Sequence, residues 1–178
     1  MRMRKKLALL LLLVSAAGVS LAQQQPEPRL QRREQALEEI GIYRPGRSNL
    51  PGEASGSYAL SPNPAEVIEI ILNGDGDQVR LQGYLTRTGD GASDRGASLT
   101  YFFARTTVSP SQLTFMTRQV HGVWWSFTGA IERGGAQMST EKGFYYLTGM
   151  LTEHFDNGQS APRRISLPLL PEGNVRSE

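Results

Sequence analysis

The sequence predicts an all-β protein: an antiparallel up-and-down meander of about seven strands that forms a small barrel or a sandwich. Two observations predict this class. From residue 66 to residue 169, short runs of β-branched and aromatic residues alternate with turn-rich stretches such as Asn73-Gly74-Asp75-Gly76-Asp77. No helical period of useful length interrupts these runs. A short N-terminal helix and a linker rich in proline and glycine precede the sheet.

The first 22 residues are expected to be a cleavable signal peptide. Basic residues at positions 2–6 are followed by an apolar run from Leu7 to Val14 and by small residues that end at Ala22. This run is too short to span a bilayer with margin, although an uncleaved anchor is the alternative. We therefore expect export to the periplasm or the outside of the cell, with cleavage between residues 22 and 23. No membrane span is expected after processing.

Composition argues against several classes of function. Four of the 19 Lys and Arg residues lie in the leader, which leaves 15 basic residues against 17 acidic ones. With no basic cluster larger than a pair, this balance argues against a nucleic-acid partner. The chain contains no cysteine, which excludes disulfides, a thiolate nucleophile and a cysteine-based metal site.

The elements follow in chain order. Residues 23–64 hold one helical candidate, 29–41, whose apolar residues share a face and which Gly41 would cap; the rest is a Pro/Gly-rich linker. Residues 65–169 form the β-domain, and residues 170–178 form a flexible tail. Strands are expected at 66–72, 78–87, 98–106, 112–119, 123–132, 143–153 and 163–168.

A weak internal repeat indicates a strongly coiled sheet. Three strand segments share the pattern apolar-x-Gly-x-apolar, which places Gly83, Gly129 and Gly149 on the apolar faces of their strands. Glycine weakens a strand interior, so three equivalent glycines indicate tight curvature or room for a neighbouring ring, chance being the alternative. The rhythm is similar to that of small barrels of the lipocalin and avidin kind, a likeness of architecture that carries over no residue. In a hollow barrel, Gly129→Leu would be nearly neutral for stability but would block an apolar pocket.

The two adjacent tryptophans are expected to have different roles. A three-residue loop, Val120-His121-Gly122, pairs Phe115 with Phe127 and keeps the apolar face coherent, whereas a two-residue turn mixes polar residues into that face. In this register Trp125 is a core residue. Trp124 lies on the outer face beside Arg118, where it is either covered, for example by the 29–41 helix, or exposed as a contact residue.

These patterns leave two sets of candidate residues. Inward-facing candidates for a ligand pocket are Tyr101, Phe103, Trp125, Phe127 and Gly129, and outward-facing candidates for a contact surface are Arg118, Trp124, Phe144 and Tyr146. No catalytic residue, metal ligand or cofactor is assigned. His154 with Glu153 and Asp156 comes nearest to an acid-base set, but neighbouring residues of a strand point to opposite faces.

The favoured function is that of an exported, non-enzymatic β-domain that binds an apolar small molecule or an envelope protein. The alternatives are a structural or protein-interaction module that uses the outer aromatic face, and a hydrolase with a site around His154. An interior cavity of ~300 Å³ lined by aromatic residues would favour ligand binding. A solid interior with an exposed aromatic patch would favour the interaction module.

Overall fold

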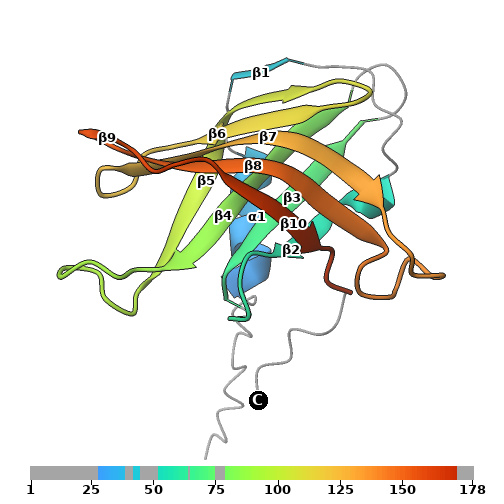
Figure 1. The fold of residues 1–178 in the computed structure, drawn as a ribbon, viewed down its shortest axis with the longest axis horizontal. Helices are drawn as coiled ribbons and strands as arrows, with labels where there is room; N and C mark the ends of the chain where they lie inside the picture. The colour runs from blue at the N-terminus through green and yellow to red at the C-terminus, as the bar shows by residue number, and fades with distance from the viewer. Residues whose placement is uncertain (1–27, 39–41, 45–51, 64, 75–78, 172–178) are drawn as a thin grey trace, which may run out of the picture.

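A computed structural model describes residues 28–38, 42–44, 52–63, 65–74 and 79–171, and it shows one mostly antiparallel sheet curled into a half-barrel (Figure 1). Eight strands of this described chain lie side by side in the order β10-β8-β7-β6-β5-β4-β3-β2. They are β2 (Gly56–Ala59), β3 (Val67–Asn73), β4 (Arg80–Thr88), β5 (Ser98–Val108), β6 (Leu113–Thr117), β7 (Val123–Arg133), β8 (Tyr145–Phe155) and β10 (Arg163–Pro168). The smaller elements are α1 (Pro28–Glu38), β1 (Ile42–Arg44), the 3₁₀ helix η1 (Gly52–Ala54) and β9 (Gly158–Gln159).

The all-β antiparallel meander is confirmed, and all seven expected strands are present as β3 to β8 and β10. The sheet is a half-barrel rather than a closed barrel or a sandwich. Its two terminal strands approach each other where Tyr58 bridges Leu169 and the Leu170 amide donates to the Ser57 carbonyl at 2.8 Å. Strand β2 also belongs to this sheet, although its residues fall in the expected linker. The sequence did not predict this strand because four residues are too few to show an alternating pattern. The expected signal peptide, the Gly41 cap and most of the expected tail lie outside the described residues.

The hairpin between β6 and β7 has the expected register but a different turn. Phe115 pairs with Phe127, as predicted. The turn contains only His121 and Gly122, with φ of 50° and 81°, and it follows the two-residue pattern that favours positive φ at both positions. Between the pairs Met116–Ser126 and Val120–Val123, the first strand of the hairpin has one residue more than the second. This irregularity lies just after β6, where the Thr117 hydroxyl accepts a hydrogen bond from the Trp125 amide at 2.9 Å. A local irregularity therefore gives the register that we had assigned to a longer loop.

The inner face of the sheet holds a stack of three aromatic rings. The ring centroids of Phe103 and Phe115 lie 4.0 Å apart, and those of Phe115 and Phe127 lie 5.2 Å apart. All three side chains are buried, with at most 5% of their surface exposed. The middle of the half-barrel is therefore filled rather than hollow.

The three repeat glycines make room for these rings. Gly129 and Gly149 pair directly across β7 and β8, and a Cβ atom added to Gly129 would lie 2.5 Å from Cζ of Phe127. At Gly83 an added Cβ would lie 2.8 Å from the Phe103 ring. Space for a neighbouring ring was one of the two reasons expected for the repeat, and the structure confirms it. The expected tolerance of Gly129→Leu is not supported, because no space is left for the side chain.

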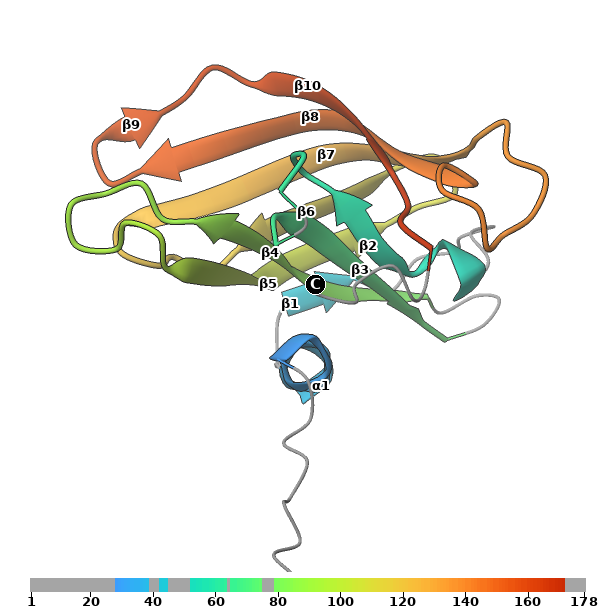
Figure 2. The same ribbon diagram turned by 90° about the horizontal axis from the view of Figure 1, so that it is seen from below.

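Helix α1 lies on the outer face of the sheet, against β3 and β4 (Figure 2). Ala36 packs there with Ile71 and Tyr84. The Glu69 carboxylate is fully buried under the helix, 3.7 Å from the nearest guanidinium nitrogen of Arg29, and it accepts a hydrogen bond from the Ser57 hydroxyl. The helix therefore covers the β3–β4 side of the sheet and not Trp124.

Candidate functional site

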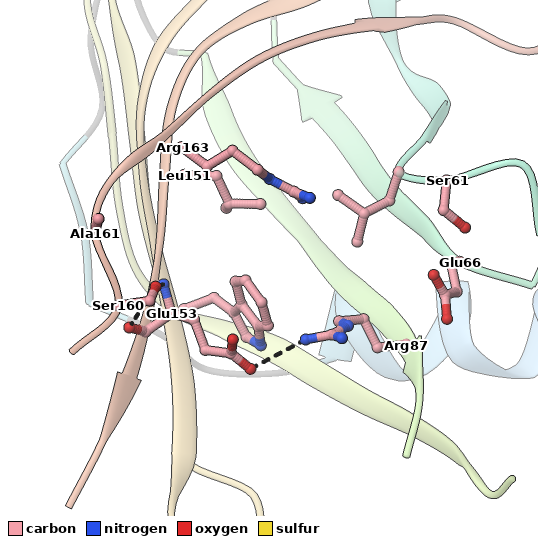
Figure 3. A pocket seen from close by; sticks show the side chains of 10 residues that line it. Ser61, Glu66, Arg87, Leu151, Glu153, Ser160, Ala161 and Arg163 are labelled. Atoms are coloured by element: carbon pink, nitrogen blue, oxygen red, sulfur yellow. Dashed lines mark hydrogen bonds and ion pairs between the residues drawn. The ribbon is translucent and has the colours of Figure 1, made fainter. Parts of the chain in front are cut away.

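Two adjoining clefts open at the end of the half-barrel that carries the loop between β4 and β5. The first has a volume of about 300 Å³ (Figure 3) and is lined by Leu60, Ser61, Glu66, Arg87, Trp125, Leu151, Glu153, Ser160, Ala161 and Arg163. The second has a volume of about 270 Å³ and is lined by the β4–β5 loop, by Tyr101 of β5 and by His121 of the β6–β7 turn. Arg87 and Glu153 line both clefts and separate them.

Arg87 and Glu153 form an ion pair across the interior. Arg87 Nη1 of β4 donates to Glu153 Oε1 of β8 at 3.0 Å, as the dashed line in Figure 3 shows, and the two side chains are 30% and 24% exposed. The guanidinium carbon of Arg87 also lies 5.1 Å from the Trp125 ring centroid, against which the Tyr101 ring packs edge-on. Arg87 is thus held between a carboxylate and an aromatic face.

The two carboxylates of the first cleft have different electrostatic environments. Burial raises the pKa of Glu153 above its usual value and Asp90 adds to this effect, whereas the positive charges of Arg87 and Arg163 only partly oppose it. At Glu66 burial acts in the same direction, but hydrogen bonds from Ser61 and Thr88 outweigh it and leave the pKa lowered. Glu153 is therefore the carboxylate that takes up a proton more easily as the pH falls.

The first cleft holds two groups that carry hydrogen-bond donors, the Trp125 indole and the Arg163 guanidinium. Trp125 Nε1 is buried and forms no hydrogen bond with any residue that the structure describes. The Arg163 guanidinium points into the cleft in Figure 3; its side chain is exposed, and its positive charge acts on Glu153. An anionic group of a ligand would complement the exposed Arg163 guanidinium, whereas Trp125 Nε1 is closed to a ligand in this arrangement.

The structure divides the expected pocket residues between two places. Trp125 lines the first cleft and Tyr101 the second, and their rings are in edge-on contact with centroids 6.4 Å apart. Phe103 and Phe127 lie in the aromatic stack, with Gly129 against the Phe127 ring.

From the sequence we did not single out Arg87, and we named Glu153 only in the acid-base set with His154 and Asp156. Arg87 follows Leu85 at the two-residue spacing of the inner face of β4, and Glu153 follows Leu151 in the same way on β8. A search for charged residues that continue an apolar face would have found both.

The expected contact residues do not form one patch. The Trp124 ring is half-buried and stacks on His154, with centroids 5.3 Å apart and planes 7° apart. Arg118 is exposed and follows β6. Phe144 and Tyr146 lie near the start of β8, whereas His154 lies near its end, and the Arg133 guanidinium carbon is 3.3 Å from the Phe144 ring centroid.

The residues of the hydrolase hypothesis also diverge. Glu153 lines the clefts, whereas His154 lies on the outer face, where its Nε2 is 2.8 Å from the Ser126 hydroxyl. The Asp156 carboxylate accepts a hydrogen bond from the Gln119 side chain. Within the described chain, no group of three or more His, Asp or Glu side chains is placed to hold a metal ion, and no helix is long and apolar enough to cross a membrane.

Comparisons with protein-family models, curated protein sequences and solved structures found no match for this chain. The clefts are therefore interpreted from their own geometry and chemistry.

Proposed function

We propose that the protein is an exported, non-enzymatic domain that binds a small molecule in the cleft beside Trp125. One observation carries this proposal: the aromatic stack fills the middle of the half-barrel, yet its end keeps a cleft of about 300 Å³ that has Trp125 and Arg163 in its lining. This volume lies at the lower end of the range of small-molecule sites, ~300–1,000 Å³. Export rests on the pattern of the first 22 residues.

The lining of the cleft supports a ligand with both apolar and polar parts. Leu60, Leu151 and the Trp125 ring supply apolar surface, while Arg87 and Arg163 supply guanidinium groups. Polar and charged side chains form the larger part of this lining, so they would fix the orientation of a ligand, and the apolar residues would contact a smaller apolar part of it. The lining thus refines the sequence-based hypothesis of a purely apolar ligand.

The alternatives have less support. The interaction module would use outer-face residues such as the exposed Met150 and the half-buried Trp124, but Phe144 and Tyr146 lie toward the other end of the sheet. The hydrolase would need Glu153 and His154 on one face, and they lie on opposite faces.

Filling the cleft tests the proposal. Ala161 is exposed and lines the cleft, so Ala161→Trp should block it without disturbing the core. The matched control is Thr128→Trp, at an exposed position on the outer face of β7. A fluorescent amphiphile should bind the wild type and the control but not Ala161→Trp, and all three proteins should melt at similar temperatures. Equal binding by all three proteins, or by none, would contradict the proposal. Native mass spectrometry of the exported protein would then identify a retained molecule.

A further inference from the structure

The balance of donors and acceptors in the first cleft indicates what its ligand must supply. Both carboxylates of the lining are already engaged: Glu66 Oε1 accepts from the Thr88 amide at 3.1 Å, and Glu153 Oε1 accepts from Arg87 at 3.0 Å. The donor that faces the open cleft is the exposed guanidinium of Arg163, whose positive charge also acts on Glu153. The complementary group is therefore an acceptor, and beside a guanidinium an anionic acceptor binds most strongly.

The apolar residues near Arg163 and Arg87 indicate the chemistry of the remaining part of the ligand. Leu60 and Leu151 line the same cleft, and the Trp125 ring lies under the Arg87 guanidinium. A small inorganic anion would leave this apolar surface uncovered, whereas a molecule with an apolar tail would cover it.

Resting on the proposed function, we infer that the cleft binds an anionic amphiphile, a molecule with one carboxylate, sulfate or phosphate head group on an apolar tail. Arg163 receives the head group, which also replaces Glu153 as the acceptor on Arg87. A planar guanidinium can exchange one oxyanion for another with little rearrangement, because both present two oxygens to the same fork of N–H groups. Glu153 thus acts as an internal competitor for the ligand.

This competition makes binding depend on pH. The charged and titratable groups around Glu153 lie on several elements: Arg87 on β4, Asp90 and Asp94 in the β4–β5 loop, Tyr101 on β5, Arg163 on β10, Glu66 before β3 and His121 in the β6–β7 turn. Because burial raises the pKa of Glu153, the carboxyl group is protonated at a higher pH than an ordinary glutamate and then releases Arg87. Affinity for an anionic head group therefore rises as the pH falls, whereas affinity for a neutral amphiphile does not.

The test compares two probes with the same tail. Octyl sulfate stays ionised at both about pH 5 and about pH 8, whereas 1-octanol carries no charge; sodium sulfate is the head group alone. Binding to the exported protein is measured by calorimetry. We expect octyl sulfate to bind about tenfold more tightly than 1-octanol at the lower pH, with a smaller advantage at the higher pH.

Three variants isolate the charges. Glu153→Gln should bind octyl sulfate about tenfold more tightly at about pH 8 and should lose the pH dependence. Arg163→Met should weaken octyl sulfate binding about tenfold and leave 1-octanol unchanged, whereas the matched control Arg164→Met, at the neighbouring exposed position of β10, should change neither.

The outcomes separate the two proposals. Failure of both octyl probes to bind the wild type would overturn the proposed function and this inference with it. Equal binding of the two probes, with no response to Glu153→Gln or Arg163→Met, would overturn the anionic head group and leave small-molecule binding standing. Sodium sulfate that binds as tightly as octyl sulfate would overturn the requirement for an apolar tail.

Discussion

Replacing Gly129 with alanine should destabilise the protein by ~1–3 kcal/mol, because the added methyl group overpacks the interior. A Cβ atom at this position would lie 2.5 Å from Cζ of Phe127 and 2.8 Å from Cα of Gly149, and closer still to the Thr148 carbonyl oxygen. Real Cβ atoms essentially never approach a heavy atom within 3.0 Å. β7 and β8 must therefore separate, and the Phe127 ring, which is stacked on Phe115, must also move.

The substitution of glycine by alanine also has a smaller, stabilising effect on the free energy of unfolding. Alanine restricts the unfolded chain more than glycine does, which stabilises a protein by ~0.4–1 kcal/mol where the folded backbone accepts it. At Gly135 only this effect on the unfolded chain is expected, because the residue is exposed and a Cβ atom there would meet nothing within 4 Å. Gly135→Ala is therefore the matched control, and it should be neutral or slightly stabilising.

Denaturant unfolding followed by tryptophan fluorescence measures both variants, provided that the slope with denaturant is unchanged. Gly149→Ala should behave like Gly129→Ala, since its Cβ would lie 2.6 Å from Cα of Gly129 and 2.7 Å from the same phenylalanine ring. If Gly129→Ala were as stable as Gly135→Ala, the interior beside Phe127 would have free space, and our account of the glycine repeat would be refuted.

Three further predictions concern the tryptophans and the titrating groups. Trp125→Ala should lower the free energy of unfolding by ~3–5 kcal/mol through cavity formation, whereas Trp124→Ala, at a half-buried position, should lower it by under about 1 kcal/mol. Equal denaturation midpoints of the two variants would contradict the assignment of Trp125 to the core. Because the pKa of Glu153 is raised in the folded state, its contribution to stability is complete below the unfolded pKa and is lost as the pH rises through the folded pKa. Glu153→Gln should therefore gain stability relative to the wild type as the pH rises from about 4 to about 7, and parallel stability–pH curves would refute this. Burial raises the pKa of Tyr84 to about 12, so its stabilising contribution is lost as the pH rises from about 10, the unfolded value, through the folded value. Tyr84→Phe should resist alkaline unfolding better than the wild type, as measured by circular dichroism, and an unchanged alkaline midpoint would contradict this.

The strands and the inner face could be predicted from the sequence because side chains alternate along a strand with a period of two. A slip of one residue would turn Phe115 and Phe127 toward solvent, so the apolar pattern alone was enough to assign the β6–β7 register. The same alternation correctly predicted the buried position of Trp125. The turn was assigned wrongly because a three-residue loop and a two-residue turn with an irregularity beside Thr117 produce the same register, and only the hydrogen bonds distinguish them.

The filled interior and the cleft were decided by the tertiary structure alone. Arg87 and Glu153 stand on β4 and β8, which are not neighbours in the sheet, so they meet only because the sheet curls. That curl depends on how the aromatic stack fits over the repeat glycines, which is a matter of side-chain volumes summed over several strands. An alternating pattern records which face a residue occupies, but the distance across the interior depends on packing between strands that are far apart in the sequence.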